Sequence, residues 1–269
     1  MNKFLVKLLL IIFFIFQITL VRAHEMWLEP INFVPTINEI LSAHIKVGQN
    51  FNGESYPYIK SETKSLKLFN QQKIIKLKHR DGDYPAIQSP MKQNGLYVLS
   101  YESIPEKVNY ENFNKFKEFL EEQDIWNKWS KENPSYINST INEIYTRYAK
   151  SLIQTGKSND EDFNTQLLFE IIALENPYSA KNKEGIKVLL LYKNKPFANS
   201  LITVFNKINN ITSKQKIITD AKGEAYIPLK KQGTYLLSAV HFIKNNNKDA
   251  DWHSLWASLT FEKKQVSTH

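Results

Sequence analysis

The sequence of 269 residues contains no cysteine and only three methionines. The absence of cysteine excludes disulfide bonds, zinc or iron–sulfur sites built on thiolates, and catalysis by a thiol. A metal ion bound to this chain must therefore be held by nitrogen and oxygen ligands, with at most a thioether in addition.

Common catalytic motifs are absent as well. The sequence has no Gly-x-Ser-x-Gly elbow, no phosphate-binding loop, no Gly-x-Gly-x-x-Gly turn and no His-Glu-x-x-His motif. Neighbouring carboxylates occur at residues 121–122 and 160–162, where a solvated surface is expected rather than a hydrolase pair. Enzymatic activity is therefore left open, and a function without turnover is favoured.

The overall composition is typical of a globular protein, with 42% hydrophobic and 23% charged residues. The 35 basic side chains outnumber the 27 acidic ones, but they are scattered lysines rather than a patch interleaved with aromatic residues. We therefore expect no nucleic-acid partner.

Residues 1–23 have the pattern of a signal peptide. Lys3 and Lys7 precede an apolar run of 13 residues, 8–20, and compact residues stand at the −3 and −1 positions of a cut after Ala23. The run is short for a membrane span, which takes about 20 residues, and an uncleaved anchor is the alternative. We expect a periplasmic protein with a formal net charge of about +5, in at most peripheral contact with the envelope.

Cleavage after Ala23 makes His24 the first residue. An N-terminal histidine offers two nitrogen ligands, the α-amine and the imidazole, which together close a chelate ring. One further imidazole completes a T-shaped set of three nitrogens, called a histidine brace, which suits Cu(II) and, less selectively, Ni(II). The alternative is that His24 is incidental and that its amine is solvated.

Residues 24–105 predict an N-terminal β-sandwich module. Short strands separated by polar turns are expected at residues 40–47, 65–69, 73–78 and 96–101. Several strands at this spacing are typical of a sandwich.

Residues 106–160 predict a helical insertion. Aromatic residues between Phe113 and Trp129 have roughly helical spacing, and Asn133 followed by proline is typical of a helix start. An apolar stripe then runs from Ile137 to Leu152 at intervals of three and four residues. We expect a helical hairpin of about 45 residues whose aromatic side chains pack rather than bind a cofactor.

Residues 161–269 predict a C-terminal module in which strands resume. The expected strands are 188–192, 201–205, 216–219, 224–229 and 233–241. Their order resembles that of small prealbumin-like sandwiches. The predicted fold is therefore mainly β, with two immunoglobulin- or prealbumin-like β-sandwich modules and an inserted α-helical hairpin.

Several segments together resemble the DUF4198 family. They are residues 23–30 (AHEMWLEP), 47–53, 145–150, 190–192, 219–223, 239–241 and 250–261, in the family's order over essentially the whole mature chain. That family is similar to the periplasmic accessory component of nickel and cobalt uptake systems. The resemblance implies an exported, β-rich, metal-linked protein with an inner-membrane metal permease as its partner, and no firmly assigned reaction.

Two of the six histidines are the main candidate metal ligands. His24 begins a family-like segment, and His241 ends a predicted strand within another. His253 is a weaker candidate, because the family more typically has a different polar residue there. Asp251 is a candidate to accept the second N–H of an imidazole and so orient it.

The other histidines carry less weight. His44 shares a strand face with Ser42 and Lys46, which favours solvent exposure as much as function. His79 lies in a basic run that is expected to be a loop, and His269 ends the chain. Glu25 and Glu29 are weaker candidates than Asp251 for orienting an imidazole.

Three functions remain. The favoured one is an exported protein that captures nickel, cobalt or copper through His24 and supports metal uptake. The second is a copper monooxygenase with a histidine brace that acts on a polysaccharide. It needs the same nitrogen ligands, a flat aromatic surface for the substrate and an open position for oxygen. The third is a cell-envelope binding or adhesion module without a metal.

Overall fold

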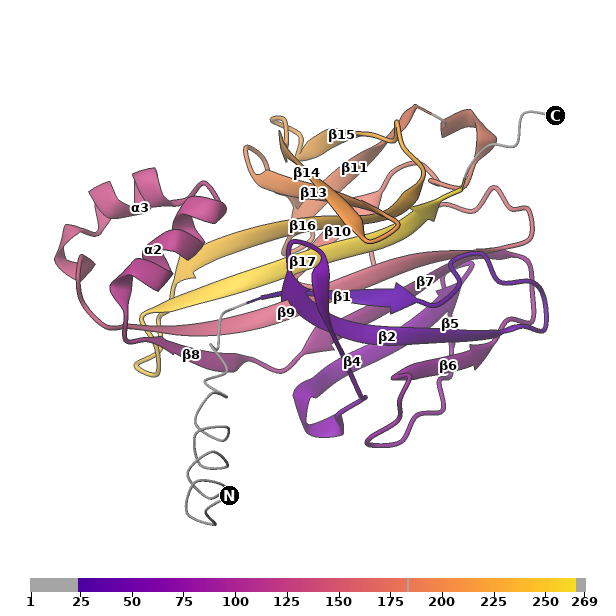
Figure 1. Ribbon diagram of the computed structural model, residues 1–269, viewed down its shortest axis with the longest axis horizontal. Helices are drawn as coiled ribbons and strands as arrows, with labels where there is room; N and C mark the ends of the chain where they lie inside the picture. Colours follow the sequence, from indigo (N-terminus) through magenta and orange to yellow (C-terminus); the bar gives the residue numbers. More distant parts are fainter. Residues whose placement is uncertain (1–23, 183, 265–269) are drawn as a thin grey trace, which may run out of the picture.

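The computed structural model describes residues 24–182 and 184–264, which form a mainly β protein with three sheets. The predicted signal peptide and His269 lie outside the described residues. In Figure 1, β9, β16 and β17 run through the middle of the molecule, with β2 and β4 on one side and β11 and β13–β15 on the other. Among the described residues, no helix is long and apolar enough to cross a membrane.

The largest sheet, called the central sheet here, has nine strands in the order β14-β13-β16-β17-β9-β7-β4-β5, with β8 paired to β9. Its strands are β4 (Thr63–Asn70), β5 (Lys73–Ile75), β7 (Gly95–Ser103), β8 (Glu106–Tyr110), β9 (Ile141–Thr155), β13 (Leu201–Ile208), β14 (Ile211–Ile218), β16 (Gly233–Lys244) and β17 (Trp252–Lys263). The pair β17–β9 is parallel, and the other pairs are antiparallel.

Two smaller sheets pack on the central sheet. The N-terminal sheet contains β1 (Glu25–Pro30), β2 (Ile40–Gln49), β3 (Asn52–Tyr56) and β6 (Ile87–Pro90). The C-terminal sheet contains β10 (Phe169–Ala173), β11 (Gly185–Tyr192), β12 (Lys195–Pro196) and β15 (Glu224–Pro228). Because both cover the same central sheet, the two sandwiches share a layer instead of standing apart.

Each sandwich has its own apolar core. Leu28 and Leu41 of the N-terminal sheet pack with Leu99 of the central sheet. Phe169 and Val188 of the C-terminal sheet belong to a second cluster, with residues of β9, β16 and β17. Burial of this apolar surface on both halves of one sheet is the main stabilising contribution to the fold.

The strand β1 joins the two halves. Its alternate residues Met26 and Leu28 belong to the N-terminal core. From the other face, Trp27 is fully buried against Phe51, Phe205 and Leu236, of which the last two lie on β13 and β16. The first strand after His24 is therefore fixed against distant parts of the chain.

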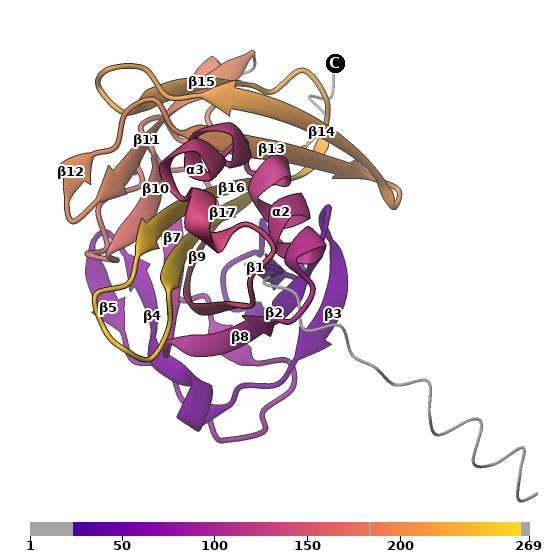
Figure 2. The same ribbon diagram turned by 90° about the vertical axis from the view of Figure 1, so that its left-hand side faces the viewer.

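Two helices, α2 (Phe113–Glu122) and α3 (Trp126–Glu132), cover one end of the central sheet (Figure 2). The Asn112 side chain accepts a hydrogen bond from the Asn114 N–H and so caps α2. The helices bury their aromatic residues against Trp252 and Trp256 of β17. Short 3-10 turns occur at η1 (Lys60–Glu62), η2 (Pro134–Tyr136) and η3 (Ala180–Asn182).

The mainly β fold class, with sandwich-like layers and two helices, is confirmed. One element prediction is wrong: the expected second helix of the hairpin is the strand β9, and proline after Asn133 begins only the turn η2. Both faces of β9 are covered, since Leu152 lies in the C-terminal core and Ile153 in the N-terminal core. Because β9 is buried along nearly its whole length, its apolar residues need not alternate with polar ones, and intervals of three and four carry no helical information there.

Candidate functional site

A pocket of about 320 Å³ surrounds His24 at the end of the molecule that carries the helices. Its walls come from β1, β2, β8, α2 and β17. The lining residues are His24, Glu25, Gln49, Tyr110, Lys115, Glu118, Phe119, Glu122, Gln123 and Trp256. Three carboxylates and one lysine thus face the residue that is predicted to begin the mature chain.

His24 is held in place through its backbone. The Arg147 guanidinium donates from Nε to the His24 carbonyl oxygen at 3.2 Å, and its Nη1 donates to Glu106 at 3.2 Å. Arg147 is buried on β9, and its guanidinium stacks on the Tyr145 ring at 4.4 Å. A guanidinium fixed on three sides places the start of the described chain at a defined position.

Glu25 is a buried acid in the wall of this pocket. It is only 6% exposed, and burial raises its pKa to about 7, with the Glu122 carboxylate contributing in the same direction. A cation that bound here would favour the ionised form and displace the proton. The wall therefore has a carboxyl group that titrates near neutral pH.

A second buried acid, Glu143, lies behind the pocket wall. Burial raises its pKa to about 7, and hydrogen bonds from Ser254 and Tyr110 act against this shift. The Ser254 hydroxyl contacts the Glu143 carboxyl group and accepts a hydrogen bond from Trp256 Nε1 at 2.9 Å. Because Tyr110 and Trp256 line the pocket, Glu143 is coupled to it through their polar atoms.

His241 lies elsewhere, among aromatic rings. Its ring centroid is 4.4 Å from that of Phe197, 4.5 Å from Tyr192 and 6.0 Å from Phe169. Burial, with Lys193 adding to the effect, lowers the pKa of His241 to about 4, so the imidazole is neutral at pH 7. It lines a larger groove of about 760 Å³ together with residues of α3, β13 and β17.

The structure does not bring His24 and His241 into one site. Successive side chains of a strand point to opposite faces. Val240 packs in the aromatic cluster with Trp256, which lines the His24 pocket. The next residue, His241, contacts Phe169 and Tyr192 of the C-terminal sheet. The two histidines therefore occupy opposite faces of the central sheet.

His253 and Asp251 also lie outside the pocket. The His253 Nε2 atom is 2.9 Å from the Thr146 hydroxyl, and burial lowers the pKa of this histidine. The Asp251 carboxylate accepts a hydrogen bond from the Asn142 N–H at 2.9 Å and so ties the loop before β17 to the start of β9.

Two further histidines contact tyrosine rings. His44 lies on β2 beside Tyr84, and its exposure matches that of Ser42 and Lys46, as strand alternation predicts. His79 packs against Tyr58 with the two rings tilted and their centroids 4.2 Å apart. Neither residue lines the His24 pocket.

The residues fit a metal only in part. Within 24–182 and 184–264, no three histidine, aspartate or glutamate side chains gather closely enough to hold a metal ion. The pocket nevertheless offers imidazole and carboxylate donors, and cleavage would add the α-amine of His24 to them. The sequence did not point to Glu118, Glu122 or Glu143 as site residues. The charge pattern around Glu118 and Glu122 indicates a solvated helix face, and Glu143 lies within an apolar stripe.

Comparison with protein families gives a match over most of the chain. The family model described as "Domain of unknown function (DUF4198)" matches residues 21–242. No protein with a curated description matches the chain.

Proposed function

We propose that this chain, which belongs to the DUF4198 family, is an exported protein that binds a nickel, cobalt or copper ion in the pocket around His24. In this proposal a signal peptidase removes residues 1–23, and the protein hands its ion to an inner-membrane metal permease. The observation that carries the proposal is the position of His24 in a pocket with three carboxylates.

The proposed ligands are the imidazole and the new α-amine of His24, with Glu118 and Glu122 as the oxygen donors. These three side chains line one pocket but do not form a close cluster in this structure, so the two carboxylates must move toward His24 when the ion binds. Both carboxylates stand on α2, one helical turn apart, so that they face the same side. This set replaces the pair of His24 and His241, since His241 faces the opposite side of the central sheet. Two nitrogen and two oxygen donors suit Cu(II) or Ni(II).

Isothermal titration of Ni(II), Co(II) and Cu(II) into a chain that begins at His24 tests the proposal. We expect one ion per chain, with affinity lost when a methionine precedes His24 and lowered at least tenfold by His24→Ala. Affinity should also rise with pH between 6 and 8, because binding displaces protons from the amine and from Glu25.

Matched variants locate the site. Glu122→Gln should weaken binding, whereas Glu121→Gln, one residue along the same helix and outside the pocket, should not. His241→Ala distinguishes the proposed ligand set from the pair of His24 and His241. If binding is lost in His241→Ala and retained in Glu122→Gln, the metal does not bind in the proposed pocket. Absence of binding by every metal favours the cell-envelope module, and peroxide-driven cleavage of a polysaccharide by the copper form favours the monooxygenase.

Export is tested separately. The N-terminal sequence of the protein recovered from the periplasm should start at His24. A start at Met1 removes the α-amine from the site and contradicts the proposal in this form.

A further inference from the structure

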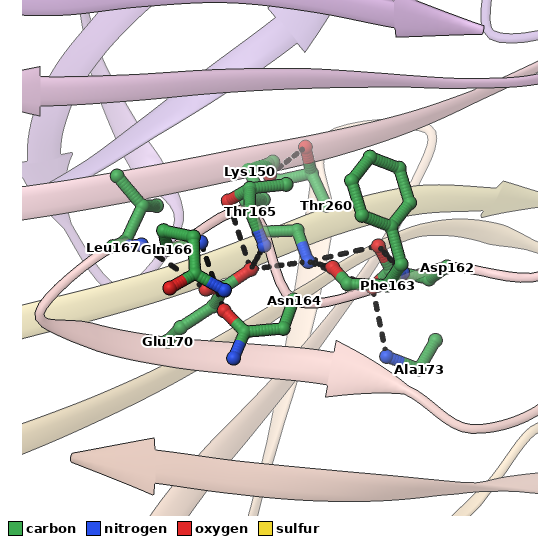
Figure 3. A network of polar contacts seen from close by, with 10 residues as sticks. All are labelled: Lys150, Asp162, Phe163, Asn164, Thr165, Gln166, Leu167, Glu170, Ala173 and Thr260. Atoms are coloured by element: carbon green, nitrogen blue, oxygen red, sulfur yellow. Dashed lines mark hydrogen bonds and ion pairs between the residues drawn. The ribbon is translucent and has the colours of Figure 1, made fainter. Parts of the chain in front are cut away.

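A lysine and two carboxylic acids are buried together at β9 (Figure 3), and none of the three lines the His24 pocket. The side chain of Lys150 is 1% exposed, and those of Asp162 and Glu170 are 0% exposed. Lys150 lies on β9, Glu170 on β10, and Asp162 on the segment that connects these strands. Neighbouring Leu167 belongs to the C-terminal core, so the cluster is surrounded by apolar side chains.

The lysine nitrogen contacts both carboxyl oxygens of Asp162. Lys150 Nζ is 2.8 Å from Asp162 Oδ1 and 2.9 Å from Oδ2. An atom this close to both oxygens also lies about 3 Å from the carbon that they share, which is the separation from which an attack on that carbon can begin. In contrast, Lys150 Nζ contacts Glu170 through Oε1 alone, at 2.9 Å.

Backbone N–H groups hold both oxygens of Asp162. The Phe163 N–H donates to Oδ1 at 2.8 Å, and the Ala173 N–H donates to Oδ2 at 2.9 Å. Donors in these positions stabilise negative charge that develops on a carboxyl oxygen during attack on its carbon. Glu170 is oriented in turn by the N–H and the hydroxyl of Thr165, both at 2.9 Å.

We propose that Lys150 and Asp162 condense into an intramolecular amide bond between Nζ and Cγ, with Glu170 as the residue that carries protons between them.

The reaction balances without an outside reagent. Glu170 takes a proton from the Lys150 ammonium, and the freed amine attacks Asp162 Cγ to form the new N–C bond. A Cγ–Oδ bond then breaks, and the leaving oxygen departs as water with two protons that both come from the ammonium, delivered by way of Glu170. An ammonium and a carboxylate become an amide and one water, no atom is oxidised or reduced, and Glu170 returns to its starting state.

The surroundings favour this product. One ammonium and two carboxylates occupy a site shielded from water, where every ion carries a large desolvation cost. Condensation replaces two of the three charges by a neutral amide, and the remaining carboxylate of Glu170 keeps the hydrogen bonds from Thr165 and from the Leu167 N–H. Burial raises the pKa of Asp162, so this acid accepts a proton more readily than an exposed aspartate does. Burial lowers the pKa of Lys150, but the two carboxylates outweigh it and the net pKa is raised, so a base such as Glu170 must remove the proton.

Mass spectrometry of the purified full chain tests the bond directly. The denatured protein should be lighter than its sequence by the mass of one water. Trypsin should leave Lys150 uncut and release a branched peptide in which residues 148–157 are joined to residues 158–181. Fragmentation of that peptide should place the branch on Asp162.

Three variants test the assigned roles. Lys150→Arg and Glu170→Gln should have the full mass of their sequences, whereas Glu161→Gln, an exposed neighbour of Asp162, should still lose one water. Circular dichroism reports whether each variant folds, and the wild-type mass decides the bond even if a variant does not. A folded wild-type chain that keeps its full mass after prolonged incubation at neutral pH overturns the proposal, and so does a branch at any residue other than Asp162. A bond that still forms in Glu170→Gln overturns the role of Glu170.

Discussion

The guanidinium of Arg147 donates a hydrogen bond from Nε to the carbonyl oxygen of His24 at 3.2 Å. The two residues are 123 positions apart in the sequence, and the contact joins the middle of the central sheet to the start of the described chain. The fold itself therefore determines where His24 lies.

Replacing this arginine should therefore affect stability and metal binding together. Arg147→Lys keeps the charge but loses the planar fork that reaches His24 and Glu106, and we expect a loss of about 1–3 kcal/mol in the free energy of unfolding. Affinity for the metal should fall roughly tenfold, as the imidazole is less well positioned. Urea denaturation and calorimetric titration measure the two effects. Arg80→Lys, at an exposed arginine, is the control and should change neither.

Glu143 should make stability depend on pH near neutrality. Its pKa is raised from 4.5 to about 7 in the folded protein, so its contribution to stability is fully present below pH 4.5 and is lost as the pH rises through 7. Glu143→Gln remains uncharged and should be more stable than the wild type at pH 8 by roughly 3 kcal/mol, and nearly equal to it at pH 4. Denaturation curves across this range give the difference. The same substitution at the exposed Glu54, Glu54→Gln, should give no such gain in stability at pH 8. An equal gain in that variant would contradict the explanation that burial of Glu143 causes the effect.

His241 should behave oppositely. Its pKa is lowered from 6.5 to about 4 in the fold, so its contribution to stability is present above pH 6.5 and is lost as the pH falls through 4. His241→Phe suits the surrounding aromatic rings and should unfold at a lower pH than the wild type, as followed by near-ultraviolet circular dichroism. Metal binding at pH 7 should be unchanged. A variant that is as acid-sensitive as the wild type would show that other groups dominate.

The buried cluster around Lys150 should be intolerant of partial removal. Lys150→Met leaves Asp162 and Glu170 buried without the lysine and also prevents the proposed amide bond, and we expect a loss of at least about 3–5 kcal/mol in the free energy of unfolding. Thermal and chemical denaturation measure it. The exposed Lys157→Met on the same connection should cost less than about 0.5 kcal/mol. Comparable losses in both variants would contradict a special role for the cluster.

Local patterns were sufficient for much of the β structure. Alternation and turn residues predicted β2, β4, β7, β11, β13, β15 and β16, because each has a recognisable boundary or a face of its own. The strand β9 could not be recognised, since its burial on both faces arises from sheets formed by residues far away in the sequence. Helix α2 was predicted because one apolar face packs on β17.

The sequence pointed to two residues of the candidate site, His24 and, as a weaker candidate, Glu25. His24 was identified from the cleavage pattern, which is a local signal. Its neighbours Glu118 and Glu122 lie on a helix whose orientation depends on aromatic packing against Trp256, so their charge pattern alone indicated only a solvated face. The sequence also could not show that His241 lies away from His24, because the sheet face to which a strand residue points decides its partners.

The parallel pairing of β17 with β9 also sets the order in which the molecule can assemble. Asn142 and Asp251, at the beginning of the pair, are 109 residues apart, and β17 is the last strand of the described chain. Contacts between residues so distant in sequence form slowly, since a long loop must close before they are made. During synthesis, the edge of β9 that pairs with β17 stays unpaired until β17 has been made. We therefore expect the last strand to be required for any stable fold, and a chain truncated before Trp252 to remain aggregation-prone.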